Sequence, residues 1–484
     1  MGGLSPRRSP EVPVLGESPR VVVVGGGPGG YEAALVAAQL GASVSVVERA
    51  GMGGSTVLTD VVPSKTLIAT AELMTTVDGS DELGLRFPGS PDGSADGVTV
   101  DLDRVNQRVR DLARAQSSDI GTRLGAEGVT ILDGTGRLRG PDLVVADLAD
   151  GSRGELPADV VLVATGSSPR TLPEALPDGE RILTWTQLYH LRELPERLVV
   201  VGSGVTGAEF ASAYDALGAE VVLVSSRDRV LPGEDADAAE VIEEVFQRRG
   251  MTVLSRSRAQ SARRTADGVV VTLADGRTVE GSHCLMAVGS IPNTAEIGLE
   301  EAGVALNDAG QIQVDRVSRT SARGVYAAGD CTGVLQLASV AAMQGRTAMW
   351  HALGDAVQPL QLRTVAANVF TAPEIATVGW TQAQIESGEA QGVVVKLPLA
   401  GNARAKMQGI HDGFVKLFCR TGSGTVIGGV VVAPRASELI FPVTLAVEHR
   451  LTVDQVAHAF TVYPSLSGSI AEAARRLHVS PAVS

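Results

Sequence analysis

Apolar runs and glycine clusters follow one another in the same order at two places in the chain. The run Val21–Val24 leads into a cluster rich in glycine, and so does the run Leu198–Val201. Each cluster opens a helix-like stretch, and a further apolar run follows it. Short, continuous apolar runs are typical of parallel strands that are buried on both faces. We therefore predict two βαβ units, at about residues 21–48 and 197–226.

The remaining pattern predicts further strands and helices. Between and after the two units we expect helices at 64–76 and 104–124, a surface loop at 78–98, and strands at Asp159–Ala164, Val269–Leu273, Val279–Ala287 and up to Asp330. Beyond about residue 365 the pattern becomes an α+β module, with strands at Gly392–Leu397, Phe414–Cys419 and Val426–Val432 and helices at 437–449 and 453–459.

Length, charge and cysteine content narrow the class of protein. The 484 residues suffice for two or three domains with their own cores. A net charge of −14 gives no support for nucleic-acid binding. The three cysteines lack CxxC or zinc-like spacing, so we predict a reduced, cytoplasmic protein without a metal site. No apolar run is long enough for a membrane span, and residues 1–19, rich in proline, are expected to form a disordered extension.

The first glycine cluster has the composition of a dinucleotide-binding turn. Gly25 permits a tight turn, Gly27 lets the backbone approach a pyrophosphate, and Gly30 lets the helix pack on the strand. Pro28 stands between them at the start of the helix, and Glu48 ends the second strand, where a carboxylate binds ribose hydroxyls. The alternative is a strand–helix turn without a ligand, but strand, helix and acid together favour a nucleotide.

The second cluster repeats this arrangement with Gly202, Gly204 and Gly207. Its distal strand ends in Ser225 instead of the acid expected for NAD, and Arg227 follows. Serine and arginine side chains suit a 2′-phosphate, so NADPH is expected as a co-substrate without excluding NADH. The alternative is that the arginines are solvated turn residues.

Further motifs resemble the pyridine nucleotide–disulfide oxidoreductases, in the order of that family and over about residues 20–478. These motifs are Gly53-Gly54-Ser55 with Pro63–Leu67, Ala164-Thr165-Gly166, Ala287-Val288-Gly289 with Pro292–Thr294, Tyr326–Asp330, and Phe370-Thr371 with Pro373-Glu374. The resemblance implies two Rossmann-like domains, which bind FAD and NAD(P), plus a C-terminal α+β dimerisation domain. Their expected extents are 20–167 with 288–360 (FAD), 168–287 (NAD(P)) and 361–484 (interface).

The resemblance also assigns residues to the cofactors. Lys65 would lie near flavin N5 and pair with Glu209, and Asp330 would bind the ribityl or pyrophosphate region of FAD. The family's motifs imply that further positions contribute to cofactor binding, namely Gly54, Ser55, Thr165, Gly166, Gly289, Gly329 and Ala338.

The chain departs from the family pattern where the redox thiols belong. Thr56 and Val61 stand at the two cysteine positions, and Tyr463 stands where the family has its histidine base. A chain without the dithiol has no thiol proton to move, so the two losses are coordinated. The chain therefore resembles a disulfide-lacking branch of lipoamide dehydrogenase-like NAD(P)H:quinone reductases.

We accordingly expect a homodimeric or higher-order FAD enzyme of the diaphorase type. It would pass hydride from NAD(P)H to the flavin and electrons to a quinone, which the partner subunit's Tyr463 would help to bind at the vacated dithiol face; the alternative is that the quinone uses the nicotinamide face. Two other functions are a soluble pyridine nucleotide transhydrogenase and a non-catalytic flavoprotein that serves as redox sensor or scaffold.

Overall fold

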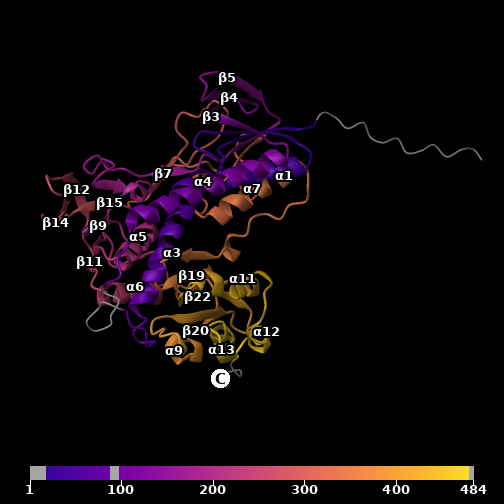
Figure 1. Ribbon diagram of the computed structural model, residues 1–484. Helices are drawn as coiled ribbons and strands as arrows, with labels where there is room; N and C mark the ends of the chain where they lie inside the picture. The colour runs from indigo at the N-terminus through magenta and orange to yellow at the C-terminus, as the bar shows by residue number, and fades with distance from the viewer. Residues whose placement is uncertain (1–17, 88–96, 479–484) are drawn as a thin grey trace, which may run out of the picture. The chain divides into compact units, whose positions relative to one another are not determined.

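The computed structural model describes residues 18–87 and 97–478 (Figure 1). These residues form two compact units. Unit 1 holds the chain up to Met52, Ile120–Thr165 and Thr294–Pro359, and unit 2 holds Gly53–Asp119, Gly166–Asn293 and the chain from Leu360 onward. This division differs from the three predicted modules in grouping 53–119 with the second dinucleotide turn, and the module boundaries stay a prediction. Most of the predicted extension 1–19 lies outside the described residues.

A seven-stranded sheet in the order β17-β6-β1-β2-β3-β4-β5 forms the centre of unit 1. The strands from β17 to β3 pair in parallel, and β3, β4 and β5 pair antiparallel. The strands are β1 (Arg20–Val24), β2 (Ser43–Glu48), β3 (Thr130–Leu138), β4 (Leu143–Leu148), β5 (Arg153–Pro157), β6 (Val160–Val163) and β17 (Val325–Ala327).

The predicted burial of the first apolar run is confirmed. Val21 and Val23 belong to one hydrophobic core of unit 1, and Val22 and Val24 belong to another. Because side chains alternate across a strand, β1 supplies both faces of the sheet. Each fully buried valine stabilises the fold by roughly 1.5–3 kcal/mol.

Helices α1 (Pro28–Gln39) and α7 (Ala338–Ala352) lie side by side in unit 1 (Figure 1). They approach closely because glycines face each other: a Cβ on Gly345 would lie 2.0 Å from the carbonyl oxygen of Gly29. The 3₁₀ helix η2 (Asp330–Thr332) follows β17 and precedes α7. The chain thus leaves β17 and reaches α7 within a dozen residues, which fixes the turn that carries Asp330.

A five-stranded parallel sheet in unit 2, in the order β11-β10-β9-β15-β8, contains the second βαβ unit. Leu198 and Val200 of β9 face one core, and Val199 and Val201 face another, as in β1. Its elements are β8 (Ile182–Thr184), η1 (Leu188–His190), β9 (Arg197–Val201), α5 (Val205–Ala216), β10 (Glu220–Val224), α6 (Ala236–Arg248), β11 (Thr252–Leu254) and β15 (His283–Met286).

Unit 2 also contains two smaller sheets and further helices. An antiparallel three-stranded sheet and a two-stranded ribbon consist of β12 (Ala259–Arg264), β13 (Val269–Leu273) and β14 (Thr278–Gly281), and of β7 (Ser167–Pro169) and β16 (Ser290–Pro292). The helices are α2 (Gly54–Leu58), α3 (Val61–Asp78) and α4 (Leu102–Ala126), most of which lies in unit 2.

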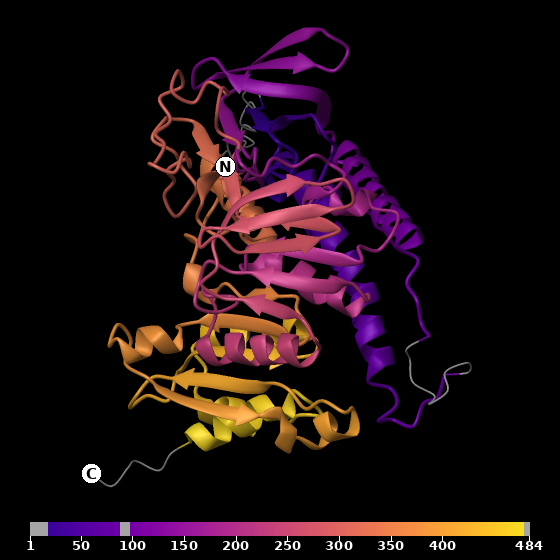
Figure 2. The ribbon, with the colours of Figure 1, turned by 90° about the vertical axis from the view of Figure 1, so that its left-hand side faces the viewer.

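The C-terminal module is an antiparallel sheet in the order β18-β19-β22-β21-β20 with helices packed on it. Figure 2 shows its orange strands with the yellow C-terminal helices against them, α13 contacting β20 and β21. The elements are η3 (Leu362–Thr364), β18 (Ala367–Val369), β19 (Glu374–Gly379), α8 (Gln382–Glu386), β20 (Val393–Pro398), η4 (Leu399–Gly401), α9 (Ala403–Met407), β21 (Phe414–Cys419), β22 (Val426–Ala433), α10 (Ala436–Leu439), α11 (Phe441–Glu448), α12 (Val453–His458) and α13 (Gly468–Leu477).

Three predicted elements differ from the structure. The predicted strand Val279–Ala287 breaks at Ser282, because β14 pairs with β13 while β15 pairs with β9 in another sheet. The predicted helix 437–449 divides into α10 and α11, where Pro442 in the first turn of α11 lacks a backbone donor. The predicted helix 64–76 begins three residues earlier in the structure, at Val61. Residues 88–96 of the predicted loop lie outside the described part of the chain.

Candidate functional site

The first glycine turn has the backbone that the sequence predicts. Gly25 has φ +103°, and a Cβ there would lie 2.3 Å from the carbonyl oxygen of Ala164. A Cβ on Gly30 would meet the Gly25 oxygen at 1.9 Å. Nothing lies within 4 Å of a Cβ on Gly27, the N-cap of α1, so the open side of the turn stays accessible. Close packing therefore requires glycine at positions 25 and 30, whereas Gly27 leaves room for a phosphate at the uncapped N-terminus of the helix. This arrangement fits FAD.

Glu48 lies at the end of β2 and faces this turn. One carboxylate oxygen accepts the Gly26 amide at 2.6 Å, and the other accepts the Ala50 amide at 2.7 Å. Each oxygen retains a lone pair for a ribose hydroxyl. The backbone hydrogen bonds hold the carboxylate beside the first glycine turn, and its binding of a ribose stays a prediction.

The residues after β6 and β17 are in the same unit. Thr165 follows β6, Gly329 and Asp330 follow β17, and Ala338 begins α7. Gly329 has φ +84°, and its amide donates to the side chain of Gln344, which is buried. The structure thus holds Thr165, Gly329 and Asp330 just beyond the carboxyl ends of parallel strands, the edge where α/β sheets bind ligands.

The second glycine turn repeats the first in unit 2. Gly202 has φ +115°, and a Cβ there would lie 2.1 Å from the carbonyl oxygen of Ala287. A Cβ on Gly207 would meet the Gly202 oxygen at 1.8 Å, and Gly204 has open space around its Cβ position. The same three constraints therefore recur, which fits a second dinucleotide.

The residue at the end of β10 differs from its predicted role. Ser225 is fully buried, and its hydroxyl lies 2.7 Å from that of Ser203 and accepts the Arg227 amide at 3.1 Å. Its side chain is thus engaged in holding the turn instead of facing a 2′-phosphate. The Arg227 side chain is exposed beside it.

A buried ion pair joins α3 to α5. The Lys65 ammonium donates to Glu209 at 2.7 Å, and the Glu209 side chain is 5% exposed. The other Glu209 oxygen accepts the backbone amide of Phe370 at 2.9 Å, and the Phe370 ring lies 4.7 Å from the ammonium. The predicted pair is therefore present, and Phe370 holds both of its members.

The segment expected to carry redox thiols forms α2 and the start of α3. Gly54 begins α2, Ser55 is exposed, and Thr56 and Val61 are half-buried. Neither the Thr56 side chain nor the Val61 side chain can form a thiolate. Two further predicted residues of unit 2, Gly166 (φ +69°) and Gly289 (φ +96°), adopt left-handed conformations that favour glycine and flank the ribbon of β7 and β16.

The three cysteines are buried, and none of them belongs to that segment. Burial raises the pKa of the Cys284 thiol to about 12 and raises the pKa of Cys419. Cys331 lies in η2, where its thiol faces the carbonyl oxygens of Val163 and Ala328. These thiols stay protonated or packed, so they are not suited to redox exchange.

The C-terminal segment presents apolar side chains. Tyr463 is 86% exposed and precedes a cis proline, and Phe460 and Val462 beside it are exposed as well. His458 also lies on the surface, where its ring is within hydrogen-bond distance of the Asp454 carbonyl oxygen. Exposed aromatic residues on an otherwise packed module are typical of an interface.

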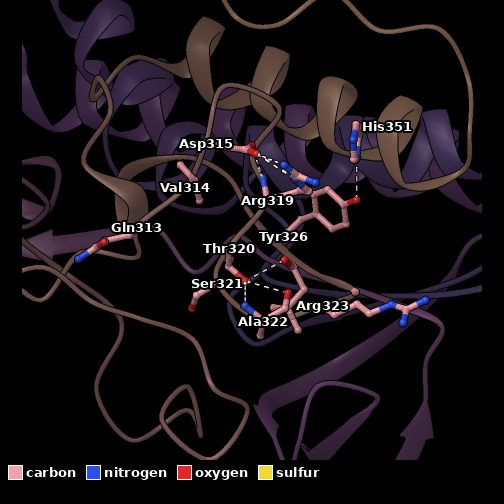
Figure 3. Close-up of a pocket in the computed structure, with 12 residues that line it drawn as sticks. Gln313, Val314, Asp315, Arg319, Thr320, Ser321, Ala322, Arg323, Tyr326 and His351 are labelled. Atoms are coloured by element: carbon pink, nitrogen blue, oxygen red, sulfur yellow. Dashed lines mark hydrogen bonds and ion pairs between the residues drawn. The ribbon is translucent and has the colours of Figure 1, made fainter.

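A pocket in unit 1 is lined by none of the predicted cofactor residues. Its volume is about 630 Å³, and the loop that leads into β17 lines it together with His351. Figure 3 shows the Tyr326 hydroxyl directed at His351, 2.8 Å from Nδ1, and Arg319 directed at Asp315. Because Gly329 and Asp330 follow the other end of β17, we assign no cofactor to this pocket.

Sequence reasoning missed Phe370 and Gln344 as supporting residues. Phe370 appeared only within a family motif, and no role was predicted for Gln344, because that role depends on α7 lying beside the turn after β17. Within residues 18–87 and 97–478, no group of histidine, cysteine, aspartate and glutamate side chains is arranged for a metal ion. No helix in that part of the chain is long and apolar enough to cross a membrane.

Comparisons with known proteins agree with this geometry. A family model described as pyridine nucleotide-disulphide oxidoreductase matches residues 19–345, and the model of the family's dimerisation domain matches 365–474. The chain is 56% identical over 467 residues to an NAD(P)H dehydrogenase (quinone) of Mycobacterium tuberculosis, covering 95% of this chain and 94% of that one. It is 34% identical over 460 residues to a dihydrolipoyl dehydrogenase of Zymomonas mobilis, covering 93% and 96%.

A solved structure extends the likeness to the fold. The crystal structure of LpdA from Mycobacterium tuberculosis matches with a TM-score of 0.90 and 55% identity, covering 95% of this chain and all of that one. Together with the two glycine turns and the Lys65–Glu209 pair, these matches show that the chain belongs to the pyridine nucleotide-disulphide oxidoreductases, flavoenzymes that use FAD and NAD(P)H.

Proposed function

We propose that the protein is an FAD-dependent NAD(P)H:quinone oxidoreductase that works without a redox disulfide. The first glycine turn, Glu48 and Asp330 would hold FAD, which would supply acceptance of a hydride from NAD(P)H and delivery of two electrons to a quinone. The observation that carries the proposal is a combination: the dinucleotide turns and the Lys65–Glu209 pair are intact, while Thr56 and Val61 occupy the thiol positions. The relative named as a quinone-reducing NAD(P)H dehydrogenase supports the same acceptor class.

Lys65, held by Glu209, supplies a positive charge at a fixed position. Glu209 is held by two donors, so the Lys65 ammonium is directed by a carboxylate that cannot rotate away. The Phe370 ring covers one side of the ammonium and reduces its hydration. A fixed, partly desolvated cation stabilises negative charge that develops on a neighbouring group, which the family resemblance identifies as the flavin.

Thr56, Val61 and the partner subunit's Tyr463 would line the acceptor site in this proposal. A hydride brings two electrons and one proton, so reduction of a quinone to a quinol needs one more proton from solvent or a hydroxyl. The Tyr463 hydroxyl offers a hydrogen bond, and the uncharged threonine and valine suit a flat, apolar ring. Homodimer formation through residues 365–474 and a cytoplasmic location complete the proposal.

Anaerobic titration of the purified flavoprotein with NADPH and with NADH, followed by a quinone panel, tests this function. We expect both nucleotides to bleach the flavin and quinones to restore its colour. Restoration by NAD⁺ or NADP⁺ alone would identify a transhydrogenase instead. A flavin that neither nucleotide reduces would identify a sensor or scaffold.

Substitution of Val61 tests the acceptor site separately. Val61→Trp is expected to raise the quinone KM while flavin reduction by NADPH stays normal, because the added ring fills the dithiol face. Normal quinone kinetics in this variant would place the quinone on the nicotinamide face instead, with ping-pong kinetics.

A further inference from the structure

The turn after β10 is joined to the loop after β11 by three backbone hydrogen bonds. The Ser225 amide donates to Leu254, the Ser257 amide donates to Ser225, and the Arg256 amide donates to Arg227, at 2.9, 2.7 and 2.8 Å. Arg256 therefore lies next to Arg227 although 29 positions separate them in the sequence. The buried contact of Ser225 with Ser203 holds the pair beside the second glycine turn.

Arg256 occupies an unfavourable backbone conformation. Its φ is +53°, in the left-handed region that costs a residue with a side chain about 1 kcal/mol. The hydrogen bonds from the backbone amides of Arg256 and Ser257 hold Arg256 in this conformation. The Arg277 side chain also donates to the Ser257 hydroxyl at 2.8 Å. The loop is thus built in a way that fixes where the Arg256 side chain emerges.

The Arg256 side chain already binds an acidic group. Its Nε donates to Asp228 at 2.9 Å, and the two side chains are 79% and 81% exposed. Such an exposed pair contributes about 0–1 kcal/mol, so a stronger anion displaces the carboxylate at little cost. A phosphate with two negative charges, bound by two guanidinium groups, is such an anion.

We propose that Arg227 and Arg256 form a clamp for the 2′-phosphate of NADPH, with Asp228 as an internal competitor. Without a 2′-phosphate, Arg256 stays paired with Asp228, so NADH is still accepted. With NADPH, Arg256 leaves Asp228 and binds the phosphate together with Arg227. Ser225 has no part in this recognition. The inference rests on the proposed function in one respect, since it takes the second turn as the NAD(P)H site.

Calorimetry on the FAD-loaded protein tests the clamp without turnover. The probes are adenosine 2′,5′-bisphosphate and 5′-AMP, and the quantity compared is the ratio of their affinities. We expect Arg256→Gln and Arg227→Gln each to reduce that ratio by about tenfold. Asp228→Asn is expected to increase it about threefold, because the competing carboxylate is gone. Ser225→Ala and Arg263→Gln, an exposed arginine of β12, should leave the ratio unchanged.

The double variant Asp228→Asn/Arg256→Gln separates competition from general charge. If Asp228 acts through Arg256, the gain from Asp228→Asn disappears in the Arg256→Gln background. A ratio that Arg256→Gln leaves unchanged, or a gain that persists in the double variant, would overturn the clamp. If the protein fails to reduce quinones but the variants change the affinity ratio as expected, the proposed function is overturned and the clamp stays in place.

Discussion

Glu209 is the residue on which three parts of unit 2 converge. Lys65 comes from α3, Glu209 from α5, and the Phe370 amide from the segment after β18, 161 residues beyond Glu209. A buried carboxylate needs its donors, because an unpaired charge in this environment costs several kcal/mol. The pair is therefore sensitive to loss of either partner, while the Phe370 side chain is less critical than its amide.

Replacement of Lys65 tests this residue-scale conclusion. Lys65→Met removes the cation from Glu209 and is expected to lower the flavin reduction potential and slow reduction by NADPH about 100-fold. Phe370→Leu keeps the amide bond and should slow reduction much less. Stopped-flow absorbance at the flavin band measures both, with Lys406→Met, an exposed lysine of α9, as the control. A normal reduction rate in Lys65→Met would contradict the assigned role.

At the scale of elements, a buried lysine joins α6 to the C-terminal sheet. The Lys416 ammonium on β21 is 1% exposed and donates to Asp235, the N-cap of α6, and to Gln382 at the start of α8. Asp237 in the first turn of α6 lies 2.8 Å away. Asp235 also accepts the amides of Asp237 and Ala238, so one carboxylate caps the helix and binds the sheet.

Removal of this cation should destabilise the fold. Lys416→Met is expected to lower the free energy of unfolding by about 3–5 kcal/mol, because it leaves the buried Asp235 carboxylate without its cation. Lys396→Met, which removes a half-exposed contact of Asp237 at 3.2 Å, should cost less than about 1 kcal/mol. Guanidinium denaturation followed by circular dichroism compares them, and equal effects would show that burial does not set the strength of the pair.

A second element-scale prediction concerns the end of α5. Burial raises the pKa of Asp215 to about 6, Arg249 opposes the shift, and Asp78 adds to it. Because the pKa is about 3.9 in the unfolded state, the unfolded chain loses this proton at a lower pH than the native state does. The group therefore lowers the free energy of unfolding between about pH 4 and pH 6, and by a constant amount above that range. Asp215→Asn should therefore raise the Tm at pH 8 and leave it unchanged near about pH 4. Asp308→Asn, on the surface, serves as control, and a gain of equal size at both pH values would argue against the shift.

At the scale of the whole molecule, the chain carries the parts of a flavoenzyme but stores no electrons in thiols. Its three cysteines lie in different strands and turns and are buried. Electrons that reach the flavin have no internal dithiol to enter. In the proposed function, electrons therefore leave the flavin for an acceptor that diffuses in.

Reductive titration checks this prediction. We expect two electrons per FAD, no long-wavelength absorbance from a thiolate–flavin contact, and no oxidation of dihydrolipoamide. Uptake of four electrons, or robust dihydrolipoamide oxidation by protein free of contaminating enzymes, would contradict it. A lipoamide dehydrogenase with its cysteine pair provides the positive control.

Most of the fold followed from local patterns. The buried valine runs predicted β1 and β9 because a strand buried on both faces must be apolar along its whole length. The break at Ser282 was missed because strands lie on both sides of it, and only their partner sheets distinguish them. The division of α10 from α11 was marked by Pro442, a signal that the prediction passed over.

The sequence alone determined the two glycine turns and the absence of redox thiols. Glycine conformations are local, and a missing sulfur atom is missing in any fold. The tertiary structure decided which groups surround those features: the burial of Ser225 against Ser203, the Phe370 amide on Glu209, and Arg256 beside Arg227. These contacts join residues distant along the chain, and they exist only because strands and helices pack in one arrangement.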